Sequence, residues 1–177
     1  MIDLSSRTKL KTIPIAWNTR NLALSKDGNY LICVSNGKGA SKKKLPEENG
    51  SVTIIDTAKN EIAATRPAGP LGIRAAYTSD TSRLVVFSRG EAPKKKGAAY
   101  IKPAVTIYAL EQEKPLAAIE FDRAAEIALS PDDKFLYVLD QGVPSKKPAE
   151  HKNGTVSVID MATAKLVKTH DVAALPL

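Results

Sequence analysis

The sequence predicts an all-β fold, and two observations support this prediction. First, the segments that begin at Ser25, Thr78 and Ser130 align without a gap, and a block of the VTIID type follows each at a spacing of 51 to 53 residues between copies. Second, each copy consists of short β-branched runs separated by Asp, Asn and Gly. Repeats of this length with four strand-like runs are typical of propeller blades, so we expect a β-propeller segment of about three four-stranded antiparallel blades, in an incomplete ring.

Each repeat contains four runs with strand character, which we name strands a to d in chain order. The expected ranges are 22–25, 73–77 and 127–130 for strand a; 30–35, 84–88 and 135–140 for strand b; blocks starting at 52, 105 and 156 for strand c; and 62–65, 116–119 and 166–169 for strand d. Asp-Gly at 27–28 and Asn-Gly at 49–50 and 153–154 lie between these runs. Such pairs tolerate the positive φ that tight turns require.

Strand b is apolar on both of its faces. The residues 31–34 read Leu-Ile-Cys-Val and the residues 84–87 read Leu-Val-Val-Phe, without the alternation of a strand that has one solvated face. Continuous apolar runs indicate that both faces are covered. In a propeller, the neighbouring blades provide that cover.

The third repeat also resembles a known family. SPDDKFLYVLDQG, from Ser130, followed by NGTVSVIDMATAKLVKT, from Asn153, resembles the YVTN-type β-propeller repeat. The first repeat lacks the Pro and has Ile32 in place of the Tyr, and the second has Ala109 in place of the Asp. The resemblance implies a propeller, and it favours a periplasmic or extracellular location. Relatives of this type include binding proteins, lactonase-like enzymes and haem-bearing reductases, so it does not imply one function.

The first residues match the end of the last repeat. Residues 1–15 align with residues 158–172, which places residues 1–20 in the outer strand of a preceding blade. We therefore expect residues 1–177 to be a single propeller segment with repeats at about 21–70, 71–123 and 124–172. Three blades do not close a ring, since propellers need about four to eight. We expect the rest of the propeller to come from a longer parent chain or from self-association.

The b-to-c loops each carry a cluster of lysines. Together, residues 36–49, 89–103 and 141–153 have a net charge of +8, against +7 for the whole chain. The candidate partner-binding residues in these loops are Lys42, Lys43, Lys44, Lys94, Lys95, Lys96, Lys146 and Lys147. Because strand direction alternates, the b-to-c and d-to-a connections lie on one face.

Two interpretations of this charged face are open. It could dock an unknown protein or an anionic ligand, or the lysines could only keep the loops solvated and protect them from edge pairing. Lysine in place of arginine, with Tyr100 as the one interleaved aromatic residue, argues against sequence-specific recognition of nucleic acid.

Two further candidates lie near the expected mouth of the central channel. Trp17, in a d-to-a connection, could stack on a ligand or be wedged between blades. Arg74, in strand a, is the other candidate partner-binding residue. The leading hypothesis is a non-catalytic binding or scaffold module. The alternative is part of a propeller enzyme, lactonase-like or cofactor-bearing, with its site at the central channel.

The sequence provides little support for catalytic or metal chemistry. His151 and His170 lack a second ligand at metal spacing, and Cys33 lies within an apolar strand, so we assign no catalytic residue, no metal and no cofactor. No run approaches about 18 apolar residues, so no membrane span is expected. Asp residues recur after strand c and in the a-to-b turn, where we expect them to cap the backbone.

Overall fold

The computed structural model describes residues 1–37, 50–69, 71–90, 100–142 and 152–173. These residues form twelve strands and no helix. The strands are β1 (Thr19–Leu24), β2 (Tyr30–Ser35), β3 (Gly50–Asp56), β4 (Glu61–Gly69), β5 (Gly72–Tyr77), β6 (Arg83–Ser88), β7 (Ala104–Ala109), β8 (Pro115–Glu120), β9 (Ala124–Leu129), β10 (Phe135–Asp140), β11 (Gly154–Asp160) and β12 (Lys165–Val172).

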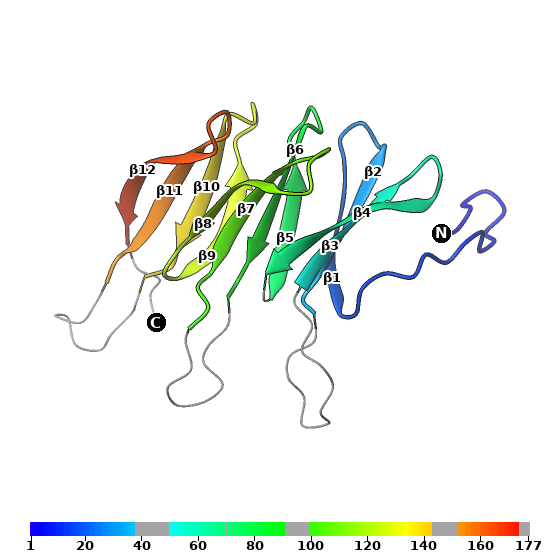
Figure 1. Ribbon diagram of the computed structural model, residues 1–177, viewed down its shortest axis with the longest axis horizontal. Coiled ribbons are helices and arrows are strands. Elements are labelled where there is room, and N and C mark those ends of the chain that lie inside the picture. Colours follow the sequence, from blue (N-terminus) through cyan, green and yellow to red (C-terminus); the bar gives the residue numbers. More distant parts are fainter. Residues whose placement is uncertain (38–49, 70, 91–99, 143–151, 174–177) are drawn as a thin grey trace, which may run out of the picture.

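Every four consecutive strands form one antiparallel sheet in chain order. We call these sheets blade 1 (β1–β4), blade 2 (β5–β8) and blade 3 (β9–β12). Figure 1 shows them side by side, with blade 1 on the right and blade 3 on the left, and the series does not close. The expected all-β class, with three four-stranded blades in an incomplete ring, is confirmed.

The inner strands were easier to predict than the outer ones. β2 and β10 have the bounds that the apolar runs predict, whereas β4 and β12 extend well beyond the expected 62–65 and 166–169. The difference follows from burial, because seven of the eight residues of β12 are exposed. An exposed outer strand is held by its backbone hydrogen bonds, so its sequence need not carry an apolar pattern.

Apolar residues of adjacent blades interdigitate to form the core. One cluster joins blade 1 to blade 2 through residues such as Ile32, Val34 and Leu84, and a second joins blade 2 to blade 3 through residues such as Phe87 and Leu136. Along β6 the side chains alternate between the two clusters, and Leu84 to Phe87 are all at most 1% exposed. The prediction that strand b is covered on both faces is therefore confirmed for the middle blade.

The outer faces of the two terminal blades lack such cover in the described part of the chain. Leu22 and Leu24 on β1 are each 61% exposed, while their equivalents in blade 2, Ala75 and Tyr77, pack into the first cluster. Tyr137, on the opposite terminal face, is 37% exposed. Soluble proteins rarely leave aligned apolar faces uncovered.

Residues 1–18 form no regular strand. Ile2 and Lys9 make an isolated antiparallel bridge, and Asp3 Oδ1 accepts hydrogen bonds from the backbone N–H groups of Ser5 and Ser6. The same bridge occurs between Ile159 and Leu166 in the c-to-d turn of blade 3. The local geometry of a c-to-d turn is thus present, and the assignment of residues 1–20 to a preceding blade stays a prediction.

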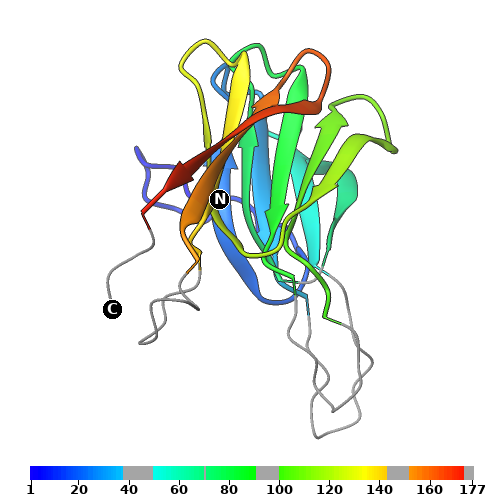
Figure 2. The ribbon, with the colours of Figure 1, turned by 90° about the vertical axis from the view of Figure 1, so that its left-hand side faces the viewer.

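The ends of the strands define two faces. The turn face carries the a-to-b and c-to-d turns, at the top in Figure 2, and the loop face carries the stems of the b-to-c and d-to-a connections. In the a-to-b turn of blade 1, Ser25 Oγ donates to Asp27 Oδ1, which also accepts the Asn29 N–H. The backbone-capping role expected for these aspartates is confirmed, and these bonds hold the pKa of Asp27 below its ordinary value.

Candidate functional site

Eight of the ten predicted binding residues are lysines of the b-to-c loops. Lys42, Lys43, Lys44, Lys94, Lys95, Lys96, Lys146 and Lys147 all lie outside the described residues. The stems of their loops are described, and they lie together on the loop face because Ser35 pairs with Ser51, Ser88 with Ala104 and Asp140 with Thr155.

Trp17 lies on the loop face just before β1. Its carbonyl oxygen accepts a hydrogen bond from Ser35 Oγ at the end of β2, which fixes the main chain at this point. The residue is 65% exposed, next to the terminal blade whose outer face lacks a neighbouring blade in the described part of the chain, so its place between blades stays a prediction. A role in stacking on a ligand stays a prediction.

Arg74 lies on β5, the first strand of blade 2, and its side chain forms an ion pair with Glu126 on β9, the first strand of blade 3. Arg74 Nε is 2.6 Å from Glu126 Oε1, with side-chain exposures of 53% and 43%. Asn21 holds the equivalent register position on β1, opposite Val34, as Arg74 lies opposite Phe87. The first strands therefore present a row of polar groups, two of which form an ion pair across the blade junction.

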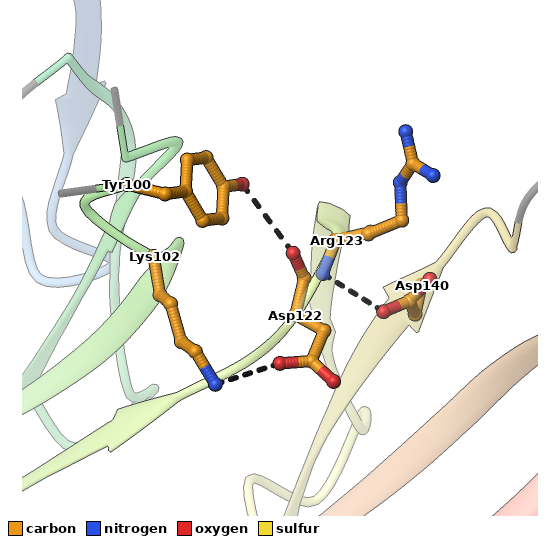
Figure 3. Close-up of polar contacts among 5 residues, drawn as sticks. All are labelled: Tyr100, Lys102, Asp122, Arg123 and Asp140. Carbon is orange, nitrogen blue, oxygen red and sulfur yellow. Dashed lines mark hydrogen bonds and ion pairs between the residues drawn. The ribbon is translucent and has the colours of Figure 1, made fainter. Parts of the chain in front are cut away.

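The junction of blades 2 and 3 on the loop face contains polar contacts that the sequence analysis missed. Figure 3 shows Tyr100 and Lys102, which precede β7, on one side of Asp122 in the d-to-a connection. Lys102 Nζ lies 2.7 Å from Asp122 Oδ1, and Tyr100 Oη donates to the Asp122 carbonyl oxygen over 3.3 Å. The ion pair lowers the pKa of Asp122 and raises that of Lys102.

The other side of this connection is held by blade 3. Asp140, the last residue of β10, accepts the Arg123 N–H on Oδ2 at 3.0 Å and the Gly142 N–H on Oδ1 at 2.9 Å. Both oxygens of Asp140 are thus bound to the backbone. In Figure 3 the guanidinium of Arg123 extends away from the carboxylate of Asp122.

A polar pocket of about 190 Å³ opens beside these contacts. Its polar lining comes from Arg89, which follows β6, and from Tyr100, Arg123 and Gln141, while Pro103, Ala124 and Ala125 form the rest of its wall. Within the described ranges, neither Arg89 nor Arg123 has a side-chain hydrogen bond or ion pair. Two arginines therefore line one pocket, and neither guanidinium group has a partner among the described residues, so both are available to an anion.

Repeat position is the one sequence signal that could have found the pocket. Arg89 aligns with Asn36 and Gln141, so a charged residue replaces a neutral amide in one repeat only. Arg89 and Arg123 line the same pocket because blades 2 and 3 pack together, and a sequence pattern within one repeat does not predict this packing.

The described residues contain no group of three or more His, Cys, Asp or Glu that could hold a metal ion. Cys33 is buried on β2, and burial raises the pKa of its thiol. No helix that could span a membrane occurs within the described ranges.

Comparisons with known proteins identify the fold. No family model matches the sequence, and no curated protein matches it. Solved structures do match: the Dos1 propeller (TM-score 0.68, 11% identity), Kuenenia stuttgartiensis hydrazine synthase (0.66, 14%) and the dihydro-heme d1 dehydrogenase NirN in complex with DHE (0.65, 12%).

These matches cover 97 to 98% of this chain but only 39%, 47% and 32% of the three structures, in the order named. At such identities the likeness shows the fold alone, which is that of a β-propeller. The chain spans less than half the length of these structures. Because they include both enzymes and a protein described only as a propeller, they do not decide between a binding module and an enzyme.

Proposed function

We propose that the chain is a non-catalytic binding or scaffold segment of a YVTN-type β-propeller, with the loop face as its surface for an anionic or protein partner. One observation carries the proposal: Arg89 and Arg123 share a polar pocket on this face, and no described residue pairs with their guanidinium groups. The b-to-c loops have a net charge of +8 in the sequence, and their stems lie on the same face. A face of one sign attracts partners of the opposite sign and increases their association rate.

A partner also has to complete the propeller. The 61% exposed Leu22 and Leu24 on one terminal face and Tyr137 on the other support a propeller completed by a longer parent chain or by a second copy. Light scattering across a concentration series distinguishes these sources. A closed dimer indicates a second copy, and a monomer or open aggregates indicate a parent chain.

The alternative function is part of a propeller enzyme with its site at the central channel. The observation that favours it is the ion pair between Arg74 and Glu126 on the first strands of blades 2 and 3. On that alternative, replacing these two residues with Gln abolishes ligand binding, whereas substitutions in the b-to-c loops leave it unchanged. The binding module predicts the reverse.

The test compares three lysines from a b-to-c loop with three lysines of the turn face. Lys42, Lys43 and Lys44 are replaced by Gln in one variant, and the exposed turn-face residues Lys26, Lys114 and Lys165 in the matched control. Both variants lose three positive charges. The binding of labelled polyglutamate and of heparin is measured by fluorescence anisotropy at several salt concentrations.

We expect the loop-face variant to bind at least about tenfold more weakly and the control to bind within about twofold of the unmodified chain, with affinity falling as salt rises. Equal weakening in both variants indicates attraction by net charge alone and overturns the assignment of the loop face. Absence of binding by the unmodified chain overturns the anionic partner.

A further inference from the structure

The pocket lined by Arg89 and Arg123 can bind one particular anionic group, beyond the general attraction of a positively charged face. An arginine beside a free carboxylate usually forms a bidentate ion pair with it. Among the described residues that contact the d-to-a connection beside the pocket, Asp122 Oδ1 is bound to Lys102 Nζ at 2.7 Å and Asp140 accepts two backbone N–H groups. Within the described part of the chain neither acid pairs with Arg89 or Arg123, so both guanidinium groups are available to a ligand.

The backbone around the pocket is held in place from two blades. Tyr100 and Lys102 of blade 2 contact Asp122, the Phe121 N–H donates to the Pro103 carbonyl over 2.9 Å, and Asp140 of blade 3 accepts the Arg123 N–H. The main chain of Arg123 is thus fixed before any ligand arrives. A fixed main chain reduces the ordering cost that binding would otherwise impose.

The size and walls of the pocket restrict the ligand. A volume of about 190 Å³ is below the 300 to 1,000 Å³, roughly, of sites for drug-sized molecules. Pro103 and Ala124 are buried and Ala125 is half-buried, so these apolar walls can contact methylene groups next to the anion. The nearby Asp122 and Asp140 carboxylates disfavour a dianion such as phosphate more than a monoanion.

We infer that this pocket holds one side-chain carboxylate of an acidic polypeptide, between the guanidinium groups of Arg89 and Arg123. The inference rests on the proposed function and names its partner class as an acidic protein segment. The planar fork of each arginine matches the two oxygens of a carboxylate, while Gln141 supplies a further N–H donor.

The experiment uses a hexaglutamate peptide, with inorganic phosphate and a hexaglutamine peptide as comparison ligands. Three variants are compared: Arg89→Lys with Arg123→Lys, which keeps the charge but removes the fork; Arg89→Gln with Arg123→Gln; and the charge-matched Lys26→Gln with Lys114→Gln on the turn face. Calorimetry gives the affinity, and NMR follows the side-chain Nε–H signals of the arginines. Far-UV circular dichroism verifies that each variant is folded.

We expect both arginine variants to bind hexaglutamate at least about tenfold more weakly, and the turn-face control to change by less than about twofold. The Nε–H signals of Arg89 and Arg123 should shift with hexaglutamate and not with hexaglutamine. Phosphate should compete only at much higher concentration.

Two results overturn the inference. If the Lys variant binds as tightly as the unmodified chain, the pocket acts only through its charge. If phosphate competes at the concentration of hexaglutamate, the site is not selective for a carboxylate. Either result leaves the proposed function standing when the Lys42, Lys43 and Lys44 variant still loses polyanion binding, so the two failures are distinguishable.

Discussion

The two faces of the molecule solve the same problem, the connection of antiparallel strands, in different ways. On the turn face, one bonding pattern occurs in all three blades: a Ser or Thr hydroxyl donates to the Asp two residues later, and the N–H two residues after that Asp donates to the same carboxylate. On the loop face the contacts among the described residues differ between blades: the Tyr100–Asp122–Lys102 contacts and the bond from Arg123 to Asp140 are found there at the junction of blades 2 and 3 alone.

The turn aspartates are thus common to every blade, whereas the polar contacts of the loop face are specific to one junction. A short turn leaves few N–H partners, so each repeat keeps the same Asp to satisfy them. The loop face has longer connections, in which side chains can vary without loss of the sheet. Polar residues that the fold does not require are therefore found on the loop face.

Acid should weaken the turn face of all three blades at once, which is the largest effect we expect. Hydrogen bonds lower the pKa of Asp27, Asp80 and Asp132, and lower that of Asp80 from 3.8 to about 2. A carboxyl with a lowered folded pKa stabilises the fold above its unfolded pKa, and this contribution is lost as pH falls through the folded value. The urea midpoint should be constant near pH 6 and fall from about pH 4 to pH 2.

The triple variant Asp27→Asn, Asp80→Asn and Asp132→Asn provides the control for this prediction. It should be less stable near neutral pH and show a flatter, though not constant, dependence below pH 4, because three of the acids with lowered pKa are gone while Asp56 and Asp160 remain. A midpoint for the unmodified chain that stays constant between pH 5 and pH 2.5 contradicts the prediction.

Glycine substitution compares the faces directly. Gly90, on the loop face, has φ +71°, and a Cβ there would lie 2.1 Å from the Ile101 carbonyl oxygen, whereas Gly28, on the turn face, has φ +76° and open space. Gly90→Ala should lower the free energy of unfolding by about 3 kcal/mol, through backbone strain and a clash, and Gly28→Ala by about 1 kcal/mol through strain alone. Urea unfolding measures both. Equal losses contradict the crowding of the loop face.

Removal of one turn aspartate should have a moderate effect. Asp80 accepts hydrogen bonds from Thr78 Oγ1 at 2.6 Å and from the Ser82 N–H at 3.0 Å. Asp80→Ala should cost about 1 kcal/mol, because these donors lose their partner. Ser79→Ala, whose backbone N–H still donates to Asp133, is the control. If Asp80→Ala lowers the free energy of unfolding by less than Ser79→Ala does, water replaces the carboxylate as acceptor and the prediction is wrong.

The smallest effect should come from the ion pair between first strands. Arg74 and Glu126 are about half exposed, so Arg74→Ala should cost about 0.5 kcal/mol. A double-mutant cycle with Glu126→Ala isolates the coupling between them, which salt should reduce. A coupling well above 1 kcal/mol would indicate that the pair is a structural element of the channel side.

The repeated parts of the fold could be predicted because the same sequence pattern occurs in all three repeats. The apolar run of residues 84–87 predicted a strand covered on both sides, and the recurring aspartates predicted capped turns. The full length of β12 could not be predicted, since its exposed side chains carry no pattern.

The candidate site depends on packing between blades, which explains why it was missed. Arg89 follows a strand of blade 2 and Arg123 precedes a strand of blade 3, and their approach depends on the angle between the two sheets. Asp140 looked like one more strand-ending residue, although it binds the connection that carries Arg123. Of the predicted site residues, the structure places Arg74 in an ion pair and Trp17 at the surface.

The burial of β6 on both sides has a consequence for the order of unfolding. Leu84 and Val86 anchor the middle blade to one neighbour, and Val85 and Phe87 anchor it to the other, whereas each terminal blade has one neighbour in the described chain. In a linear array, stability is the sum of intrinsic terms and nearest-neighbour terms. Opening should therefore proceed from both ends as separate cooperative units, with the amides of β6 the last to exchange.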